Sequence, residues 1–408
     1  MTWSTPSRRA LLGGLCSAGL LAPGLSRALA GADRRFVFVW SDGGWDPLAV
    51  FAPMFGRRDI EMDARAEPWT VGGLPLVDHP DRPAVRSFFD AHAAACVVVG
   101  GLSVPSVSHD ICALLAMTGS GDGQAPDWPT RLAEARASAY VLPSVVVSGP
   151  SFTADRGGVT ARLGGAGQLQ ALVDGRITGR TPTLSVEASR GVDDALVRIL
   201  GRSNAPGARD LADSVVRARQ LEGSVDALGL GAVETADDRS RVAARVLGSG
   251  LARVVTLGSP YGLYWDSHAN NESVQTAALE ELFGALTVLM EGLASTPSPQ
   301  GGVLLDDTIV VCLSEMGRTP RLNAGAGRDH WPFTSALLFG GGLSGGRAVS
   351  GYDDGFNGLG CDPATGAIDP ARPALTPAHL GASLLSLADV DPAEVLPGVA
   401  PIGPLVTG

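Results

Sequence analysis

Short, continuous runs of apolar and β-branched residues recur along the chain and are typical of strands buried on both faces. They predict strands over Arg35–Ser41, Ala95–Gly100, Leu142–Ser148, Arg253–Leu257, Thr308–Ser314 and Ala336–Phe339. Apolar residues at helical spacing predict helices between them, over Ile111–Thr118, Asp210–Glu222, Arg239–Gly248, Ser273–Gly292 and Pro377–Ala388. This alternation predicts an α/β fold with a doubly wound, mainly parallel sheet between helices.

The stretch from about 151 to 234 interrupts the alternation, because it is richer in Gly, Arg and Asp. We interpret it as a partly helical insertion or cap within a single domain over 31–408. The length of the chain, 408 residues, suits one large α/β domain that carries such an insertion.

The first thirty residues have the pattern of an export signal. Arg8 and Arg9 precede an apolar run over Ala10–Leu25, and the small residues Ala28 and Ala30 follow it. This order predicts a twin-arginine signal peptide over 1–30. The alternative, a membrane anchor, is disfavoured because the run is short and rich in Gly, Ser and Pro. We therefore expect the twin-arginine machinery to export the folded chain to the periplasm or the extracellular space, leaving no transmembrane segment after cleavage.

The charged residues narrow the classes of function. The 31 cationic side chains are all arginine, since the sequence contains no lysine, which excludes Schiff-base chemistry and a phosphate-binding P-loop lysine. The net charge of −11 would repel nucleic acid, so a nucleic-acid partner is not expected. The cysteines of the mature chain form no CxxC motif and are expected to pack as small apolar residues, with their pairing left open: Cys96, Cys112, Cys312 and Cys361.

Polar residues follow the predicted strands, where ligands bind in open parallel sheets. Asp42 follows the first strand and precedes two glycines, which suits either a metal ligand or an ordinary turn. Ser108 and His109 follow the second strand and open a helix. Ser108 is then either a helix cap beside a surface histidine or an activated hydroxyl at a helix N-terminus, where an anion is favoured.

Two later clusters carry the strongest signals. Asp266 and His268 are two residues apart, so both side chains can reach one metal ion. Glu315 ends a fully apolar strand, where a buried carboxylate needs a cation. A divalent metal would supply that cation, and the alternative is an ion pair with Arg318. Arg318 and Arg328 are candidates for binding two oxygens of an anionic substrate.

Histidines and carboxylates occur together in these clusters more often than chance placement suggests. His109, His268 and His330 each lie beside an acid after a predicted strand. The remaining three lie in polar or helical surroundings, do not follow a predicted strand and are expected at the surface: His79, His92 and His379.

Taken together, these motifs resemble the DUF1501 family of exported bacterial proteins, which is distantly similar to the alkaline phosphatase and sulfatase superfamily. The resemblance rests on the twin-arginine leader, Asp42-Gly-Gly-x-Asp46, Ser108-His-Asp110, Asp266-x-His268-x-Asn270, and above all Ser314-Glu-x-Gly-Arg-Thr-Pro320 with Arg328-Asp-His330. It implies an alkaline-phosphatase-like sheet with one or two divalent metals at its carboxyl edge. The implied metal ligands are Asp42, Asp266, His268, Glu315, Asp329 and His330.

The resemblance also implies roles for the remaining polar residues. Ser108 would be the nucleophile, assisted by His109, and the substrate would contact Asn270, Arg318 and Arg328. No Cys-x-Pro-x-Arg sulfatase signature surrounds Ser108, so a formylglycine nucleophile is not supported.

These residues lead to a first hypothesis, an exported metal-dependent hydrolase of phosphate or sulfate esters with a two-metal type of site. Its substrate would be a small-molecule or glycan ester, and its mixed ligands favour Zn or Mn over Ca or Mg. The alternative is a non-catalytic metal- or glycan-binding or assembly protein on the same fold. A mutase or isomerase is less favoured, because an exported protein has no access to cytosolic sugar phosphates.

Overall fold

The computed structural model describes residues 34–163, 186–203, 205, 208, 212, 215–216, 233–259 and 264–406. The predicted signal peptide over 1–30 and most of the predicted helix Asp210–Glu222 lie outside these residues. No helix in the described part of the chain is both long enough and apolar enough to cross a membrane.

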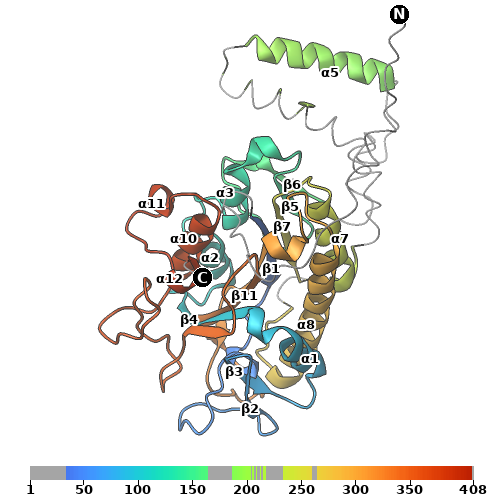
Figure 1. Ribbon diagram of the computed structural model, residues 1–408. Coiled ribbons are helices and arrows are strands. Elements are labelled where there is room, and N and C mark those ends of the chain that lie inside the picture. The colour runs from blue at the N-terminus through green and yellow to red at the C-terminus, as the bar shows by residue number, and fades with distance from the viewer. Residues whose placement is uncertain are drawn as a thin grey trace, which may run out of the picture.

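A central eight-stranded sheet organises the molecule, with the strand order β12-β4-β11-β8-β1-β7-β5-β6 (Figure 1). In chain order its strands are β1 (Arg35–Ser41), β4 (Cys96–Ser103), β5 (Ser144–Val146), β6 (Thr160–Arg162), β7 (Val254–Gly258), β8 (Thr308–Ser314), β11 (Phe333–Gly340) and β12 (Arg347–Ser350). Every neighbouring pair is parallel except those that β11 makes with β4 and β8. The predicted mainly parallel α/β sheet is therefore confirmed.

Alternate residues of β1 point to opposite faces of the sheet, as the pleat of a strand requires. Val37 and Val39 belong to one apolar cluster, whereas Phe36, Phe38 and Trp40 belong to another. All seven residues of β1 are buried, because helices cover both faces. This explains why the strand appears in the sequence as a continuous apolar run.

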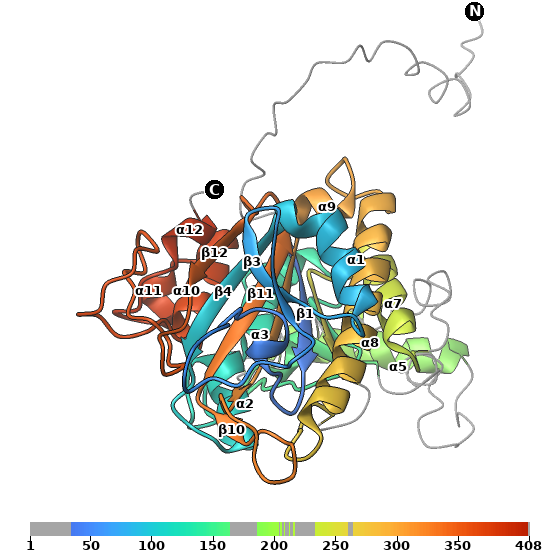
Figure 2. The same ribbon diagram turned by 90° about the horizontal axis from the view of Figure 1, so that it is seen from below.

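The helices divide between the two faces (Figures 1 and 2). One cluster contains residues of α1 (Pro83–His92), α7 (Ala236–Gly248) and α8 (Asn271–Ser295), and the other contains residues of α2 (His109–Thr118), α3 (Trp128–Glu134) and α10 (Pro377–Leu387). The shorter helices and the helix of the predicted insertion are α5 (Val186–Gly201), α9 (Leu304–Asp307), α11 (Pro392–Val395) and α12 (Gly403–Val406), with single 3-10 turns at Pro47–Ala49, Ala93–Ala95, Ala137–Ala139 and Gly157–Val159.

Two small antiparallel pairs stand outside the main sheet. One joins β2 (Glu67–Val71) to β3 (Leu74–Asp78). The other joins β9 (Gly317–Arg318) to β10 (His330–Trp331), with His330 opposite Arg318. Because β9 follows β8 after only two residues, this second pair places His330 at the carboxyl end of β8.

Candidate metal centre

Segments that follow four strands meet at the carboxyl edge of the sheet. His109 is the first residue of α2, after β4, and Asp266 and His268 lie in the segment between β7 and α8. His330 comes from β10, which Figure 2 shows beside the start of α2. Ring contacts join the three histidines, with centroids 4.4 Å apart for His109 and His330 and 4.5 Å apart for His268 and His330.

Ligand atoms of His109, Asp266 and His330 all lie within 4.8 Å of one another, and His268 adjoins this group. The Nε2 atoms of His268 and His330 are 2.9 Å apart. Asp266 Oδ1 lies 3.3 Å from the first nitrogen and 3.5 Å from the second, and His109 Nε2 lies 3.6 Å from Asp266 Oδ2. Ligand atoms about 2.0–2.1 Å from a tetrahedral ion are separated by about 3.3–3.4 Å, which the contacts of Asp266 Oδ1 with His268 and His330 approach.

The other ring nitrogen of each histidine contacts an oxygen that can only accept a hydrogen bond. His109 Nδ1 lies 2.8 Å from Glu315 Oε1, and His268 Nδ1 lies 2.8 Å from Asp329 Oδ1. His330 Nδ1 lies 2.7 Å from the carbonyl oxygen of Val107. Carbonyl and ionised carboxylate oxygens have no proton to donate, so each Nδ1 carries the hydrogen and each Nε2 presents a lone pair.

Metal-binding histidines have this arrangement, with one nitrogen on the metal and the other donating to an oxygen. His109 Nε2 is buried and has no hydrogen-bond partner. Two facing lone pairs, as in His268 and His330, repel one another unless a cation lies between them. The donor chemistry of the site therefore fits a divalent metal ion.

Local hydrogen bonds favour the ionised forms of Asp266 and Asp329. Burial alone would raise the pKa of Asp266, but the hydrogen bond from Arg318 and that residue's charge hold it below the ordinary value. The hydrogen bond with His268 lowers the pKa of Asp329. The hydrogen bond with Glu315 raises the pKa of His109, whereas burial lowers the pKa of His330. A metal ion must displace any proton held by His109, so its binding is expected to strengthen with pH.

Glu315 supports the cluster without facing it. Its side chain is fully buried and accepts hydrogen bonds from Gly43 N at 2.7 Å and Ser314 Oγ at 3.0 Å, besides contacting His109. Asp329 likewise contacts His268. These two predicted metal ligands therefore contact the Nδ1 atoms of His109 and His268, and His109, predicted as a catalytic residue, lies beside Asp266. The roles of all three residues stay predictions.

Asp42 lies at the same edge of the sheet, where its backbone forms a hydrogen bond with the segment that carries Asp266. Its carbonyl oxygen accepts from Trp265 N at 3.0 Å, and its Oδ1 accepts from Trp40 Nε1 at 3.4 Å. The glycines after it have positive φ, 117° at Gly43 and 81° at Gly44. These conformations let both carbonyl groups face Arg318. A role for Asp42 as a metal ligand stays a prediction.

The two arginines predicted to bind substrate are engaged by protein groups. Arg318 is fully buried and donates to Gly43 O, to Gly44 O at 2.9 Å, to Arg328 O at 3.1 Å and to Asp266 Oδ1 at 2.7 Å. These contacts hold Arg318 in β9, opposite His330. They give Arg318 a structural role that was not expected from the sequence.

Arg328 is also buried. It donates to Thr319 O at 2.6 Å and to Glu61 O, and its Nε forms an ion pair with Asp46 Oδ2 at 3.1 Å, although the N–H is not aimed at that oxygen. The predicted role of Arg318 and Arg328 in substrate binding gains no support from these contacts.

Ser108 and Asn270 remain at the surface beside the cluster. Ser108 is exposed at the N-cap of α2, where its hydroxyl caps no backbone N–H. It lies between Val107, which accepts from His330, and His109. Asn270 precedes α8 in a left-handed conformation with φ of 52° and lines a cavity of about 840 Å³.

A second group of acids surrounds His79, which is buried, so the prediction that it lies at the surface is wrong. Its Nε2 lies 3.4 Å from Asp63 Oδ1 and 3.7 Å from Glu272 Oε1. Its Nδ1, however, accepts from the N–H of Asp81 at 3.1 Å. The proton of neutral His79 therefore lies on Nε2, so the imidazole of His79 has no free lone pair for a metal ion.

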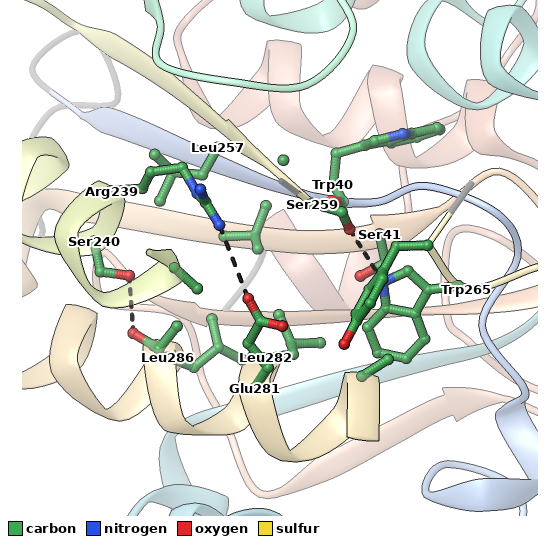
Figure 3. Close-up of a pocket in the computed structure, with 16 residues that line it drawn as sticks. Trp40, Ser41, Arg239, Ser240, Leu257, Ser259, Trp265, Glu281, Leu282 and Leu286 are labelled. Atoms are coloured by element: carbon green, nitrogen blue, oxygen red, sulfur yellow. Dashed lines mark hydrogen bonds and ion pairs between the residues drawn. The ribbon is translucent and has the colours of Figure 1, made fainter. Parts of the chain in front are cut away.

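An apolar cavity of about 50 Å³ lies between β7 and the helices α7 and α8 (Figure 3). Trp40, Leu257 and Trp265 line it, and Arg239 and Glu281 approach within 4.0 Å at one side. A space of this size holds one or two water molecules at most. This cavity is too small for an ester substrate, so it is not a candidate substrate site.

Comparisons with solved structures found matches at low identity and with low TM-scores. A protein of the alkaline phosphatase superfamily from Vibrio parahaemolyticus shares 12% identity over 90% of this chain and 69% of its own, with a TM-score of 0.39. A putative sulfatase from Bacteroides thetaiotaomicron shares 10% identity over 92% of this chain and 75% of its own, with a TM-score of 0.38. A phosphonate monoester hydrolase of Agrobacterium radiobacter shares 12% identity over 91% of this chain and 78% of its own, with a TM-score of 0.33.

No relative was found among the curated proteins. The sequence profile of one family, described as "Protein of unknown function (DUF1501)", matches residues 180–391, slightly more than half of the chain. The matched range includes most of the cluster, from Asp266 and His268 to Glu315, Arg318 and His330. As the motifs around these residues led us to expect, the chain belongs to the DUF1501 family.

Proposed function

We propose that this protein is a metal-dependent hydrolase of phosphate or sulfate esters that acts in the periplasm or outside the cell. The observation that carries the proposal is the group of His109, Asp266 and His330, whose ligand atoms lie within 4.8 Å of one another. His268 adjoins it, and each histidine has its Nδ1 bound to an oxygen. Three imidazoles and one carboxylate favour Zn or Mn over Ca or Mg.

One ion fits this set better than two. The predicted second ion would need Glu315 and Asp329, but these carboxylates contact the ligand histidines. A bound ion would neutralise charge on the ester oxygens and lower the pKa of an oxygen nucleophile. The proposed ligand set is accessible to solvent on the side of His268, since 47% of that side chain is exposed.

Ser108 is the residue that we propose as the nucleophile. It is exposed, precedes the ligand His109 and stands at the N-terminus of α2, a helix of ten residues. Free backbone N–H groups at a helix N-terminus stabilise an anion, which suits a phosphate or sulfate oxygen. Asn270, in the wall of the larger cavity, remains a candidate for substrate contact.

The test begins with protein purified without chelator, whose metal content is measured by elemental analysis. Turnover of aryl phosphates and aryl sulfates is then compared for the wild type, Ser108→Ala and the control Ser295→Ala, which removes an exposed hydroxyl at the far end of α8. We expect about one metal ion per chain and a rate that only Ser108→Ala lowers, by at least about 100-fold. A wild type without metal would overturn the proposal.

A second candidate is a non-catalytic metal-binding protein. If His268 joined His109, Asp266 and His330 on the ion, the four side chains would fill a tetrahedral set, whereas catalytic zinc sites keep one position open. The contacts of Arg318 and Arg328 also favour this candidate, because the described hydrogen bonds of both guanidinium groups go to protein oxygens. Stoichiometric metal without turnover of any ester would favour this candidate.

A further inference from the structure

The polar residues behind the metal ligands form a closed ring of hydrogen bonds. Gln275 Nε2 donates to Ser267 Oγ at 3.1 Å, and Ser267 Oγ donates to Asn271 Oδ1 at 2.6 Å. Asn271 Nδ2 donates to Asp46 Oδ2 at 2.9 Å, and Asp46 N donates to Gln275 Oε1 at 2.8 Å. We call these four residues, Asp46, Ser267, Asn271 and Gln275, the polar ring.

The polar ring is buried, so its hydrogen bonds do not compete with solvent. Ser267 and Gln275 are fully buried, and Asp46 and Asn271 are 4% and 5% exposed. Asn271 and Gln275 are four residues apart on α8 and therefore project from the same face of the helix. A buried donor or acceptor that loses its partner destabilises the fold, which makes the arrangement stiff.

Each member of the ring holds a different part of the metal centre. Ser267 lies between the ligands Asp266 and His268, and its carbonyl oxygen accepts from Arg328 N at 3.0 Å. Gln275 Nε2 also lies 2.9 Å from the carbonyl oxygen of Trp265, the residue before Asp266. The ring thereby fixes the backbone on both sides of Asp266.

Asp46 connects the ring to the remaining ligand segments. It is the second acid of the turn after β1, and its Oδ2 lies 3.1 Å from Arg328 Nε. Arg328 precedes Asp329 and His330 in the chain. The same turn provides Gly43 N, which binds Glu315 behind His109.

We infer that the polar ring is a positioning device for the metal centre, with Gln275 as the residue that sets the separation of Asp266 and His268. The inference rests on the proposed metal site. Gln275 touches no ligand side chain, and its effect passes through Ser267 and the carbonyl of Trp265. Supporting groups of this kind contribute about 10–100-fold to metal affinity.

The experiment compares the wild type with Gln275→Met, which keeps the length of the side chain but has no donor or acceptor for the ring. Ser267→Ala is the second ring variant. The control, Ser240→Ala, removes the buried hydrogen bond from Ser240 Oγ to Ala285 O at 2.9 Å, which also ends on α8 but lies outside the ring. Zn²⁺ dissociation constants are measured by competition with a chromophoric chelator, and the Co²⁺ forms are compared by visible absorption.

We expect both ring variants to bind Zn²⁺ about 10–100-fold more weakly and to show altered Co²⁺ spectra, while the control keeps the affinity and the spectrum of the wild type. Thermal unfolding of the metal-free forms separates loss of the fold from loss of positioning. Wild-type affinity and spectrum in both ring variants would overturn the positioning role and leave the proposed function standing. A wild type that binds neither ion would overturn both.

Discussion

The Nε2 atoms of His268 and His330 lie 2.9 Å apart, and each ring donates its Nδ1 hydrogen to an oxygen on the opposite side. Two neutral imidazoles cannot hydrogen-bond to each other in this orientation, because neither Nε2 carries a proton. A metal ion between the two rings would relieve the repulsion, and this relationship supports the first prediction.

Adding Zn²⁺ is expected to stabilise the wild type, because the ion binds the folded chain and has far fewer preorganised ligands in the unfolded chain. At a free concentration 100 times the dissociation constant, the gain is about 2.7 kcal/mol. His330→Ala should abolish most of this gain, whereas His92→Ala, on α1, should keep it. The measurement is the denaturant midpoint with Zn²⁺ and with chelator. An equal gain in both variants would contradict the assignment.

Glu315→Gln should weaken Zn²⁺ binding by about 10–100-fold without removing a ligand. The amide is a weaker acceptor for the Nδ1 hydrogen of His109 and leaves that imidazole less basic. Asp329→Asn provides the comparison, because Asp329 is 58% exposed and water can replace it. We expect the smaller loss there. Titration with a competing chelator gives both constants, and a larger loss in Asp329→Asn would refute the role given to Glu315.

Gly327→Ala tests how closely the two ligand segments approach each other. A Cβ at this position would stand 2.0 Å from the carbonyl carbon and oxygen of His268, so the segment that carries His268 must move. Metal affinity should fall by about 10-fold or more, as when supporting contacts are lost. Gly284→Ala, where nothing lies within 4 Å of the new Cβ, should keep the affinity and stabilise α8 by about 0.5–1 kcal/mol.

Much of the fold could be predicted from the apolar runs. The bounds of β1 and β8 agree with the prediction to the residue, because both strands are central and end where polar groups begin. The direction of β11 could not be predicted, since an apolar run has the same appearance in a parallel and an antiparallel strand. The edge strands β6 and β12 were missed because they are short and partly exposed.

The sequence grouped Asp266, His268 and His330, and their side chains contact one another in the structure. The roles assigned to these residues stay predictions, because sequence patterns do not show which atoms a carboxylate faces. Glu315 and Asp329 differ from Asp266 only in what they face. The burial of His79 was missed because Asp63 and Glu272, its neighbours in space, are distant in the sequence.

His379 should make the stability of the protein depend on pH independently of the metal centre. Its Nδ1 accepts from the N–H of Thr376 at the start of α10, at 3.1 Å, and burial lowers its pKa below the ordinary value of 6.5. The folded chain therefore binds this proton more weakly than the unfolded chain does. His379 contributes its full stability above pH 6.5, and that contribution is lost as the pH falls toward its lowered pKa.

His379→Gln isolates this effect, because glutamine can accept the same N–H at the third position of a helix and does not titrate. The free energy of unfolding in urea is measured for both proteins at pH 7.5 and pH 5, with chelator present throughout. We expect the wild type to lose more stability than His379→Gln over this interval. All other groups are the same in both proteins and cancel in the difference, so a difference that stays constant with pH would show that the Thr376 contact survives protonation.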